Sequence, residues 1–305
     1  LAGEISLMSI RTLMGAAALF GFVACSGATD GLAQETDPVV APTLADVDAN
    51  PAHWRVVDPD NLVLFETTKG RIVLEVFPEV APAHVAHFKA YIRAGLYDST
   101  LFHRVIKGFM AQGGDVAAIH GAEAMLGPIQ AEFTFRRAPE TFPIDVIGPS
   151  DSAEAGFFRG VPIRTQAQFL ADMSFDGQVE SWIPHCAGVL SSARTNDPDS
   201  ADAQFFLISD QGQHLDRQYT AKGRVLQGLE VVKAIKLGPE PNGFPIANPD
   251  ILQSARLVSD LPEADRPIVY VQRTDSPEWI DRRAEADQRR TRICDLPPVP
   301  AVIVE

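Results

Sequence analysis

The amino-acid sequence predicts a mainly β fold. Two pairs of short apolar runs, each joined by a tight turn with a glycine, have the pattern of antiparallel hairpins. Further runs of strand character follow them, whereas helical periodicity is confined to a few segments. With 305 residues, 46% of them hydrophobic, the chain is long enough for one domain with a real core and with extensions at its ends.

The second hairpin places a charge in an unusual setting. The two hairpins pair residues 62–67 with 71–77, and residues 101–106 with 109–112. Period-two alternation sends Phe102 and Arg104 to the same face, so a guanidinium points inward beside aromatic rings. A buried charge needs a partner, and no acid lies in this stretch before Asp115. Either Arg104 pairs with an acid elsewhere in the fold, or an apolar cleft holds it to donate to a neutral ligand carbonyl.

A helix is predicted between the hairpins. Pro82 is a favourable first residue, apolar residues recur at three- and four-residue spacing, and Gly95 ends the pattern. His84 and His87 lie on this helix at a spacing that permits a shared metal. No third ligand is evident nearby, so we expect two solvated histidines.

The later part of the chain alternates strand character with irregular segments. Strands are expected at residues 129–135, 186–190, 204–209 and 251–258. Helices are expected at 227–235 and from Ser276 to about Arg292, where interspersed acids indicate a solvated face. Between 136 and 182, prolines and glycines accumulate around a short helix expected at 166–173. Such a long insertion is either functional or poorly ordered.

The N-terminal segment has the pattern of an export signal. Arg11 precedes an apolar run of 13 residues, too short to span a bilayer comfortably, so residues 1–33 are predicted to be a signal peptide. We favour cleavage near Ala33; the alternatives are a lipoprotein-like box at Cys25, which would attach the chain to a membrane, and a cytosolic protein with an apolar N-terminal helix. Residues 34–55, rich in Pro, Asp and Ala, are predicted to be a linker.

Charge and cysteines limit the partners and the compartment. The formal net charge is −14, from 40 acidic and 26 basic residues, which argues against nucleic acid as a partner. Outside the predicted signal the cysteines are Cys186 and Cys294. In a periplasmic or secreted protein they could form a disulfide that joins the C-terminal tail to the main domain, or they could stay unpaired.

At this point the sequence resembles a known family. The stretch from Phe102 to Asp115 is similar to the signature of the cyclophilins, which are peptidyl-prolyl cis-trans isomerases. Two more blocks match in order, residues 188–208 and 215–232, and three ordered blocks are more specific than one short motif. The resemblance covers roughly residues 61–257, with one long interruption.

The resemblance implies a fold and a division of the chain. The expected architecture is a cyclophilin-like closed eight-stranded antiparallel β-barrel capped by two α-helices. The isomerase domain would cover residues 56–262, with the insertion at about 136–182 bordering the substrate groove. Residues 263–305 would form a C-terminal helical extension.

Isomerisation of an X-Pro bond sets modest chemical demands. The bond rotates slowly because amide resonance must be broken, a barrier of about 18 to 20 kcal/mol. The twisted transition state has a more basic nitrogen, so a dry site that donates a hydrogen bond favours it. Arg104 is the natural donor, and the resemblance implies that Gln112 assists it and fixes the peptide carbonyl. No nucleophile, metal or cofactor is required.

The resemblance also implies where a substrate binds. It assigns the proline slot and the sites before the proline to Phe109, Met110, Phe206, Leu215, Ala193, Arg194 and Gln204. Two positions depart from cyclosporin-binding members: His214 replaces a tryptophan and Tyr219 replaces a groove histidine. We therefore expect weak cyclosporin inhibition with catalysis retained. Lys222, where an aromatic is common, falls outside the slot and is expected to affect packing.

The expected partners are therefore proline-containing polypeptides, above all exported chains that are not yet folded. The rival hypothesis is a proline-peptide binding or chaperone module without turnover.

Overall fold

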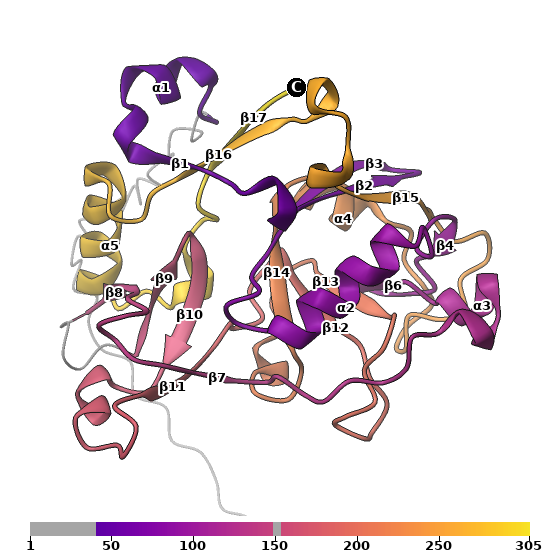
Figure 1. Cartoon of the computed structure of the whole chain (residues 1–305), viewed down its shortest axis with the longest axis horizontal. Coiled ribbons are helices and arrows are strands. Elements are labelled where there is room, and N and C mark those ends of the chain that lie inside the picture. Colours follow the sequence, from indigo (N-terminus) through magenta and orange to yellow (C-terminus); the bar gives the residue numbers. More distant parts are fainter. Residues whose placement is uncertain (1–40, 149–153) are drawn as a thin grey trace, which may run out of the picture. The chain divides into compact units, whose positions relative to one another are not determined.

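The computed structural model describes residues 41–148 and 154–305 (Figure 1). The predicted signal peptide, Cys25 and residues 34–40 of the predicted linker lie outside the described residues. Residues 41–305 form a single unit. Among the helices described, none combines the length and apolar character needed to cross a membrane.

The main sheet contains nine antiparallel strands. They are β2 (Leu62–Thr67), β3 (Gly70–Val76), β4 (Thr100–Leu101), β5 (Arg104–Ile106), β6 (Met110–Gly113), β12 (Val189–Ser192), β13 (Phe205–Ile208), β14 (Ala221–Gln227) and β15 (Ile251–Leu257). Their order is β4-β15-β2-β3-β14-β12-β13-β6-β5. Both predicted hairpins are present, as β2–β3 and β5–β6.

The predicted closed eight-stranded barrel is not confirmed, because the sheet is open. Its two ends are β4 and β5, which follow each other in the chain and are separated by Phe102 and His103. At these two residues the segment changes partner from β15 to β6 and is divided into two short strands. The break also overturns the expected alternation: Val105, not Arg104, joins Phe102 in the core.

The inner face of the main sheet encloses an aromatic core. Phe65, Phe88, Tyr97 and Phe102 pack around Phe205, with ring centroids 5.3 to 6.3 Å apart. Burying one such ring contributes about 1.5 to 3 kcal/mol. The helices of this part of the chain are α2 (Pro82–Arg93), α3 (Val116–His120) and α4 (Leu229–Ala234), and α2 closes the core through apolar residues on one face. The predicted helix at 227–235 corresponds to α4.

The two helical histidines are not solvated as predicted. His84 is buried, with Nδ1 2.8 Å from the Ser192 hydroxyl and Nε2 3.0 Å from the Gln130 carbonyl oxygen. Lys222 is also buried and donates to the same hydroxyl over 2.8 Å. Nε2 of His87 lies 2.8 Å from an Asp202 carboxylate oxygen. Each ring thus has a fixed hydrogen-bond partner inside the fold, which periodicity alone did not indicate.

The insertion folds into a second sheet. Its strands are β7 (Phe135–Arg137), β8 (Asp145–Ile147), β9 (Ala155–Phe158), β10 (Val161–Thr165) and β11 (Val179–Trp182), in the order β7-β11-β10-β9-β8. Arg159 and Gly160 connect β9 to β10 with φ of +48° and +83°, as in a type I′ turn. The helix expected at 166–173 is only a 3₁₀ turn, Gln168–Ala171.

The two ends of the described chain meet in a third sheet. Strands β1 (Trp54–Val56), β16 (Ile268–Gln272) and β17 (Ala301–Val304) pair in the order β1-β16-β17. Part of the predicted linker is therefore folded, as helix α1 (Leu44–Ala49) and β1. The predicted C-terminal helix is present as α5 (Pro277–Gln288), which lies beside β8 in Figure 1. Its buried Trp279 packs edge-on against Phe157 of the insertion, with centroids 5.4 Å apart.

Candidate active site

The predicted site residues lie on the outer face of the main sheet. Alternation along β5, β6 and β13 divides the side chains between two clusters. The inner core takes Val105, Ala111, Phe205 and Leu207. The opposite face takes Arg104, Met110, Gln112 and Phe206, and pairing of Arg104 with Gln112 across β5–β6 brings these residues together.

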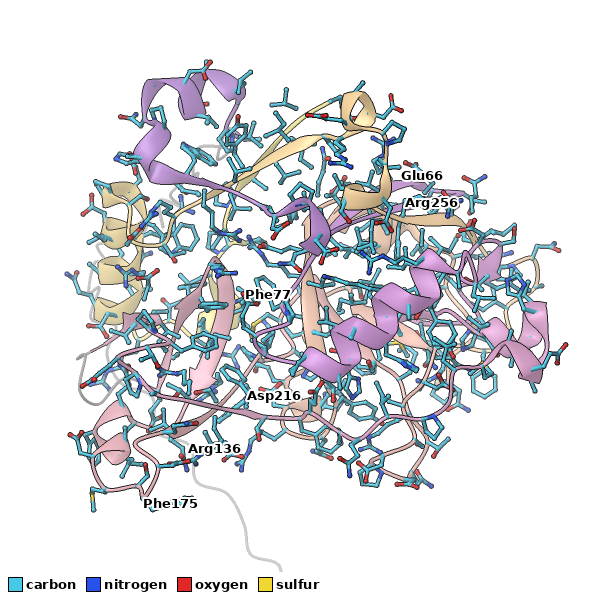
Figure 2. All side chains as sticks on the ribbon, viewed as in Figure 1. Glu66, Phe77, Arg136, Phe175, Asp216 and Arg256 are labelled. Atoms are coloured by element: carbon cyan, nitrogen blue, oxygen red, sulfur yellow. A yellow bond between two sulfur atoms is a disulfide. The ribbon has the colours of Figure 1, made fainter. Side chains whose placement is uncertain are left out.

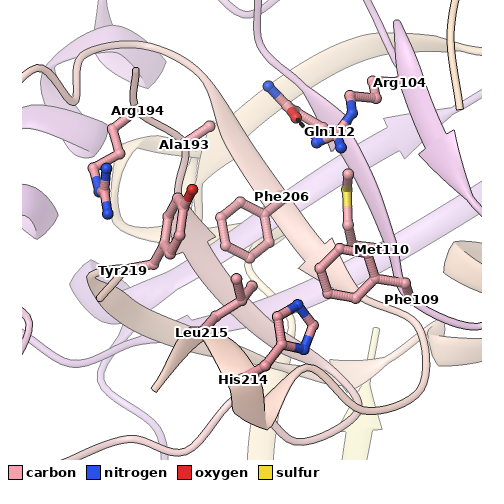
Figure 3. Close-up of a pocket in the computed structure, with 10 residues that line it drawn as sticks. All are labelled: Arg104, Phe109, Met110, Gln112, Ala193, Arg194, Phe206, His214, Leu215 and Tyr219. Atoms are coloured by element: carbon pink, nitrogen blue, oxygen red, sulfur yellow. Dashed lines mark hydrogen bonds between the residues drawn. The ribbon is translucent and has the colours of Figure 1, made fainter. Parts of the chain in front are cut away.

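A cavity of about 260 Å³ opens on this face (Figure 3). Its walls are formed by Arg104, Phe109, Met110, Gln112, Ala193, Arg194, Phe206, His214, Leu215 and Tyr219. All of these were predicted from the sequence. The remaining predicted substrate-binding residue, Gln204, does not line the cavity but accepts a hydrogen bond from Gln112.

Arg104 is oriented by amide groups and not by an acid. Its Nη1 donates to Oε1 of Gln112 over 3.2 Å, and its Nε donates to the Asn242 carbonyl over 3.0 Å. Nε2 of Gln112 then donates to Oε1 of Gln204 over 2.8 Å. Within the described residues, no carboxylate forms an ion pair with Arg104 and no acceptor engages its Nη2. The first sequence interpretation, an acid elsewhere in the fold, is therefore not met among the described residues, and the second, donation from an apolar cleft to a neutral ligand carbonyl, stays a prediction.

The predicted proline slot beside Arg104 has a buried apolar floor, although the cavity is open to solvent. Met110 and Phe206 are 2% and 4% exposed. Tyr219 meets Phe206 edge-on with ring centroids 5.7 Å apart, and His214 lies 4.9 Å from Phe109. Side chains packed this closely exclude water from the floor of the slot. Figure 3 shows Phe206 between Tyr219, which lies beside Arg194, and Met110, which lies below the Arg104–Gln112 pair, with Leu215 and His214 at the lower edge.

Arg194 has a different role from Arg104. Its Nε and Nη2 donate to the Gln218 carbonyl over 3.0 and 2.9 Å, and its Nη1 donates to the Thr195 carbonyl over 2.7 Å. The guanidinium also lies 4.3 Å from the centroid of the Tyr219 ring, within the range of a cation–π contact. With its donors already engaged, Arg194 shapes the rim of the cavity.

The insertion packs against the same outer face. Ile144, Val161 and Ile163 belong to one buried cluster with Met110 and Phe206. A second contact joins the insertion to the turn before Tyr219, where Arg217 pairs with Glu180 over 3.0 Å and lies 5.3 Å from the ring of Trp182. The insertion therefore braces one wall of the cavity.

Three contributors to the site were missed in the sequence. The Asn242 carbonyl orients Arg104, and a main-chain contact leaves no signal in residue type. A Cβ on Gly212 would lie 2.9 Å from Cδ1 of Ile208 and 3.1 Å from the Phe109 ring, so a larger residue there would have to displace Ile208 or Phe109. His185 stacks on Phe206, with ring planes inclined by 16°, and its residue type alone gives no sign of this contact.

Two strongly shifted groups lie behind the site. Burial lowers the pKa of the Lys222 ammonium to about 7. Burial, together with the nearby Lys222 charge, lowers the pKa of His84 to about 4. Both contact Ser192, the neighbour of Ala193, but neither lines the cavity. In the part of the chain that the structure describes, there is no group of three or more His, Cys, Asp or Glu residues arranged to hold a metal.

Comparison with known proteins supports the three-block resemblance. The family model described as "Cyclophilin type peptidyl-prolyl cis-trans isomerase/CLD" matches residues 62–256. A protein of Brucella abortus named "Probable peptidyl-prolyl cis-trans isomerase" is 33% identical over 203 residues, 67% of this chain and 85% of its own. A Streptomyces antibioticus protein named "Peptidyl-prolyl cis-trans isomerase cyp18" is 31% identical over 57% of this chain and 82% of its own.

A solved structure extends the likeness beyond the isomerase domain. The crystal structure of cyclophilin AquaCyp293 from Hirschia baltica is 48% identical, with a TM-score of 0.80. The match covers 87% of this chain and 98% of that one. Family model, relatives and solved structure agree with the three sequence blocks, and the chain belongs to the cyclophilin family of peptidyl-prolyl cis-trans isomerases.

Proposed function

We propose that this isomerase acts through Arg104 in the apolar proline slot, and that its clients are exported polypeptides. The observation that carries the first part is a guanidinium held by Gln112 and Asn242, with no acid in an ion pair among the described residues. Its charge stays available to a ligand at the edge of the slot formed by Met110 and Phe206.

The proposed mechanism needs only positioned side chains. The proline ring enters the slot, and Nη2 of Arg104 donates to the nitrogen as it becomes pyramidal. Gln112 fixes the guanidinium and accepts no proton itself. A charge-assisted hydrogen bond contributes about 1.5 to 3 kcal/mol, or about one to two decades in rate. The rest comes from exclusion of water and from holding the flanking chain.

Export is supported by two features of the chain. The predicted signal at residues 1–33 supplies a route, and Cys186 and Cys294 form a disulfide in the folded domain. Disulfides form and persist in oxidising compartments such as the periplasm. Exported polypeptides with X-Pro bonds are therefore the clients we propose.

A protease-coupled assay with a short X-Pro peptide tests the proposed role of Arg104. Arg104→Ala should lose at least about 90% of kcat/KM while its circular dichroism is unchanged. The matched control is Arg71→Ala, which removes an exposed arginine paired with Glu66 and Glu305 and should keep the parent rate. A folded Arg104→Ala protein with parental kcat/KM would refute the mechanism.

One surface favours an additional chaperone role. Phe169, Met173 and Phe175 are 49%, 77% and 101% exposed within seven residues of the insertion. Their loop is ordered by the ion pair of Asp176 with Arg136, and Figure 2 shows Phe175 at the edge of the view beyond Arg136. Exposed apolar groups of this kind often contact polypeptides. Serine at Met173 and Phe175 should leave short-peptide isomerisation unchanged and weaken suppression of client aggregation; unchanged suppression would exclude this role.

A further inference from the structure

His185 lies directly behind the floor of the proline slot. Its ring is fully buried and stacks on Phe206, with centroids 6.0 Å apart and planes inclined by 16°. Offset stacking at this separation restrains both rings. Phe206 lines the cavity and lies in the middle of the residues drawn in Figure 3, so the position of His185 limits where that ring can move.

The same residue holds both ends of the segment that forms the opposite wall. The Gly212 N–H donates to the His185 carbonyl over 2.8 Å. At the other end, the backbone N–H and Nδ1 of His185 lie 2.8 and 3.0 Å from Oδ1 of Asp216. Between these anchors lies the 3₁₀ turn Gln213–Leu215, which contributes His214 and Leu215 to the cavity.

The Asp216 carboxylate determines which nitrogen of the His185 ring donates a hydrogen bond. Because the Asp216 carboxylate can only accept, Nδ1 of His185 carries a proton in this contact. Nε2 is buried and has no hydrogen-bond partner among the described residues. The ring therefore makes its hydrogen bond through Nδ1 and its stacking contact with Phe206, and both contacts lead to walls of the slot.

The C-terminal extension fixes His185 from outside the isomerase domain. Cys294 in the 3₁₀ turn Ile293–Asp295 forms the disulfide with Cys186, the next residue after His185. The adjacent Asp295 accepts a hydrogen bond of 2.9 Å from Nε2 of Gln211, the residue before Gly212. The turn Ile293–Asp295 thus contacts the neighbours of both His185 and Gly212, the two residues joined by the backbone hydrogen bond.

From these contacts we propose that His185 is a positioning residue of the proline slot and that the C-terminal extension holds it in place. The proposal rests on the proposed function of the same slot. His185 touches no substrate; it fixes Phe206 and Leu215 in the positions that receive the proline ring. Since the slot binds proline in both the ground and transition states, disturbing it acts on KM, whereas loss of Arg104 acts on kcat.

Two substitutions separate the two contacts of the ring. His185→Phe keeps the stacked ring and loses the Nδ1 hydrogen bond, and His185→Asn keeps a donor and loses the stack. Each should raise KM and weaken peptide binding about tenfold, equivalent to about 1.4 kcal/mol, with kcat within about twofold of the parent. His53→Phe is the matched control, because His53 pairs with Glu278 in the extension and is remote from the cavity.

The extension is tested without altering His185. Serine at both Cys186 and Cys294 should raise KM about threefold, and a reductant should do the same to the parent but not to the double variant. Circular dichroism and thermal unfolding show whether each protein is folded. Binding of an X-Pro peptide, measured by titration calorimetry, reports on the slot even if turnover is absent, so failure of the catalytic proposal is distinguishable. Parental KM and peptide affinity in a folded His185→Phe protein, or in the double serine variant, would overturn the proposal.

Discussion

Gln112→Glu is a sharp test of why Arg104 has no acidic partner. The substitution changes one amide nitrogen to oxygen and keeps the length and shape of the side chain. It places a carboxylate where Oε1 now accepts from Nη1 of Arg104 over 3.2 Å. The Gln204 amide, which now accepts from Gln112, can turn to donate instead. We expect an ion pair that draws the guanidinium away from the slot.

The size of the effect follows from what the ion pair replaces. If Arg104 supplies a charge-assisted hydrogen bond of about 1.5 to 3 kcal/mol in the transition state, its loss lowers kcat about 10- to 150-fold. Stability should not fall, because a half-buried pair replaces a half-buried lone charge. Protease-coupled kinetics and thermal unfolding measure the two quantities. Gln112→Leu is the control that removes the acceptor without adding charge and should cost less. A folded Gln112→Glu enzyme with parental kcat would refute the argument.

Three further predictions concern other parts of the fold. Burial lowers the pKa of Lys222 from 10.5 to about 7, so the unfolded state binds more protons between these values and the parent's unfolding free energy rises with pH there. Lys222→Met should lack that rise and be the more stable protein at pH 7 in denaturant titrations; equal pH slopes would contradict this. His214→Trp should supply a ring N–H beside Phe109 and lower the cyclosporin concentration needed for inhibition about tenfold. An unchanged inhibition constant would show that another residue limits cyclosporin binding. Trp279→Ala should cost about 3 to 5 kcal/mol, because Trp279 is fully buried against Phe157; a smaller loss in chemical denaturation would show that the extension folds independently.

The elements predicted well were those whose signals are local. Three elements depend on residues within a few positions of each other. They are the hairpin of β2 and β3, helix α2, which begins at Pro82, and helix α5, which follows Ser276. The cavity residues came instead from the order of three sequence blocks. Composition could not have found them, because Phe109 and Phe206 have the pattern of ordinary core residues.

The elements missed depend on contacts between distant segments. Residues 44–56 have no strong periodicity, yet β1 is fixed by pairing with β16, more than two hundred residues later. The insertion carries prolines throughout, yet it forms a sheet. Gly160 allows the tight turn between β9 and β10, and one face of the sheet is buried against the cluster that contains Met110 and Phe206. Arg104 was placed on the wrong face because the break at Phe102 and His103 shifts the alternation by one residue, which no local pattern records.

Leaving Arg104 without an acidic partner costs folding free energy, and its position at the cavity edge keeps that cost small. A guanidinium fully buried without an acid would be strongly destabilising, whereas Arg104 stays half-buried at the cavity edge and donates to two oxygen acceptors. Structural arginines are satisfied in two ways in this fold: buried Arg224 lies near Glu75, whereas buried Arg137 donates to hydroxyl and carbonyl oxygens. Arg104 differs from both because it lines the cavity and its Nη2 has no acceptor among the described residues. This position argues that its charge is retained for a ligand, since an acid at residue 112 would satisfy the guanidinium and remove the donor that the slot requires.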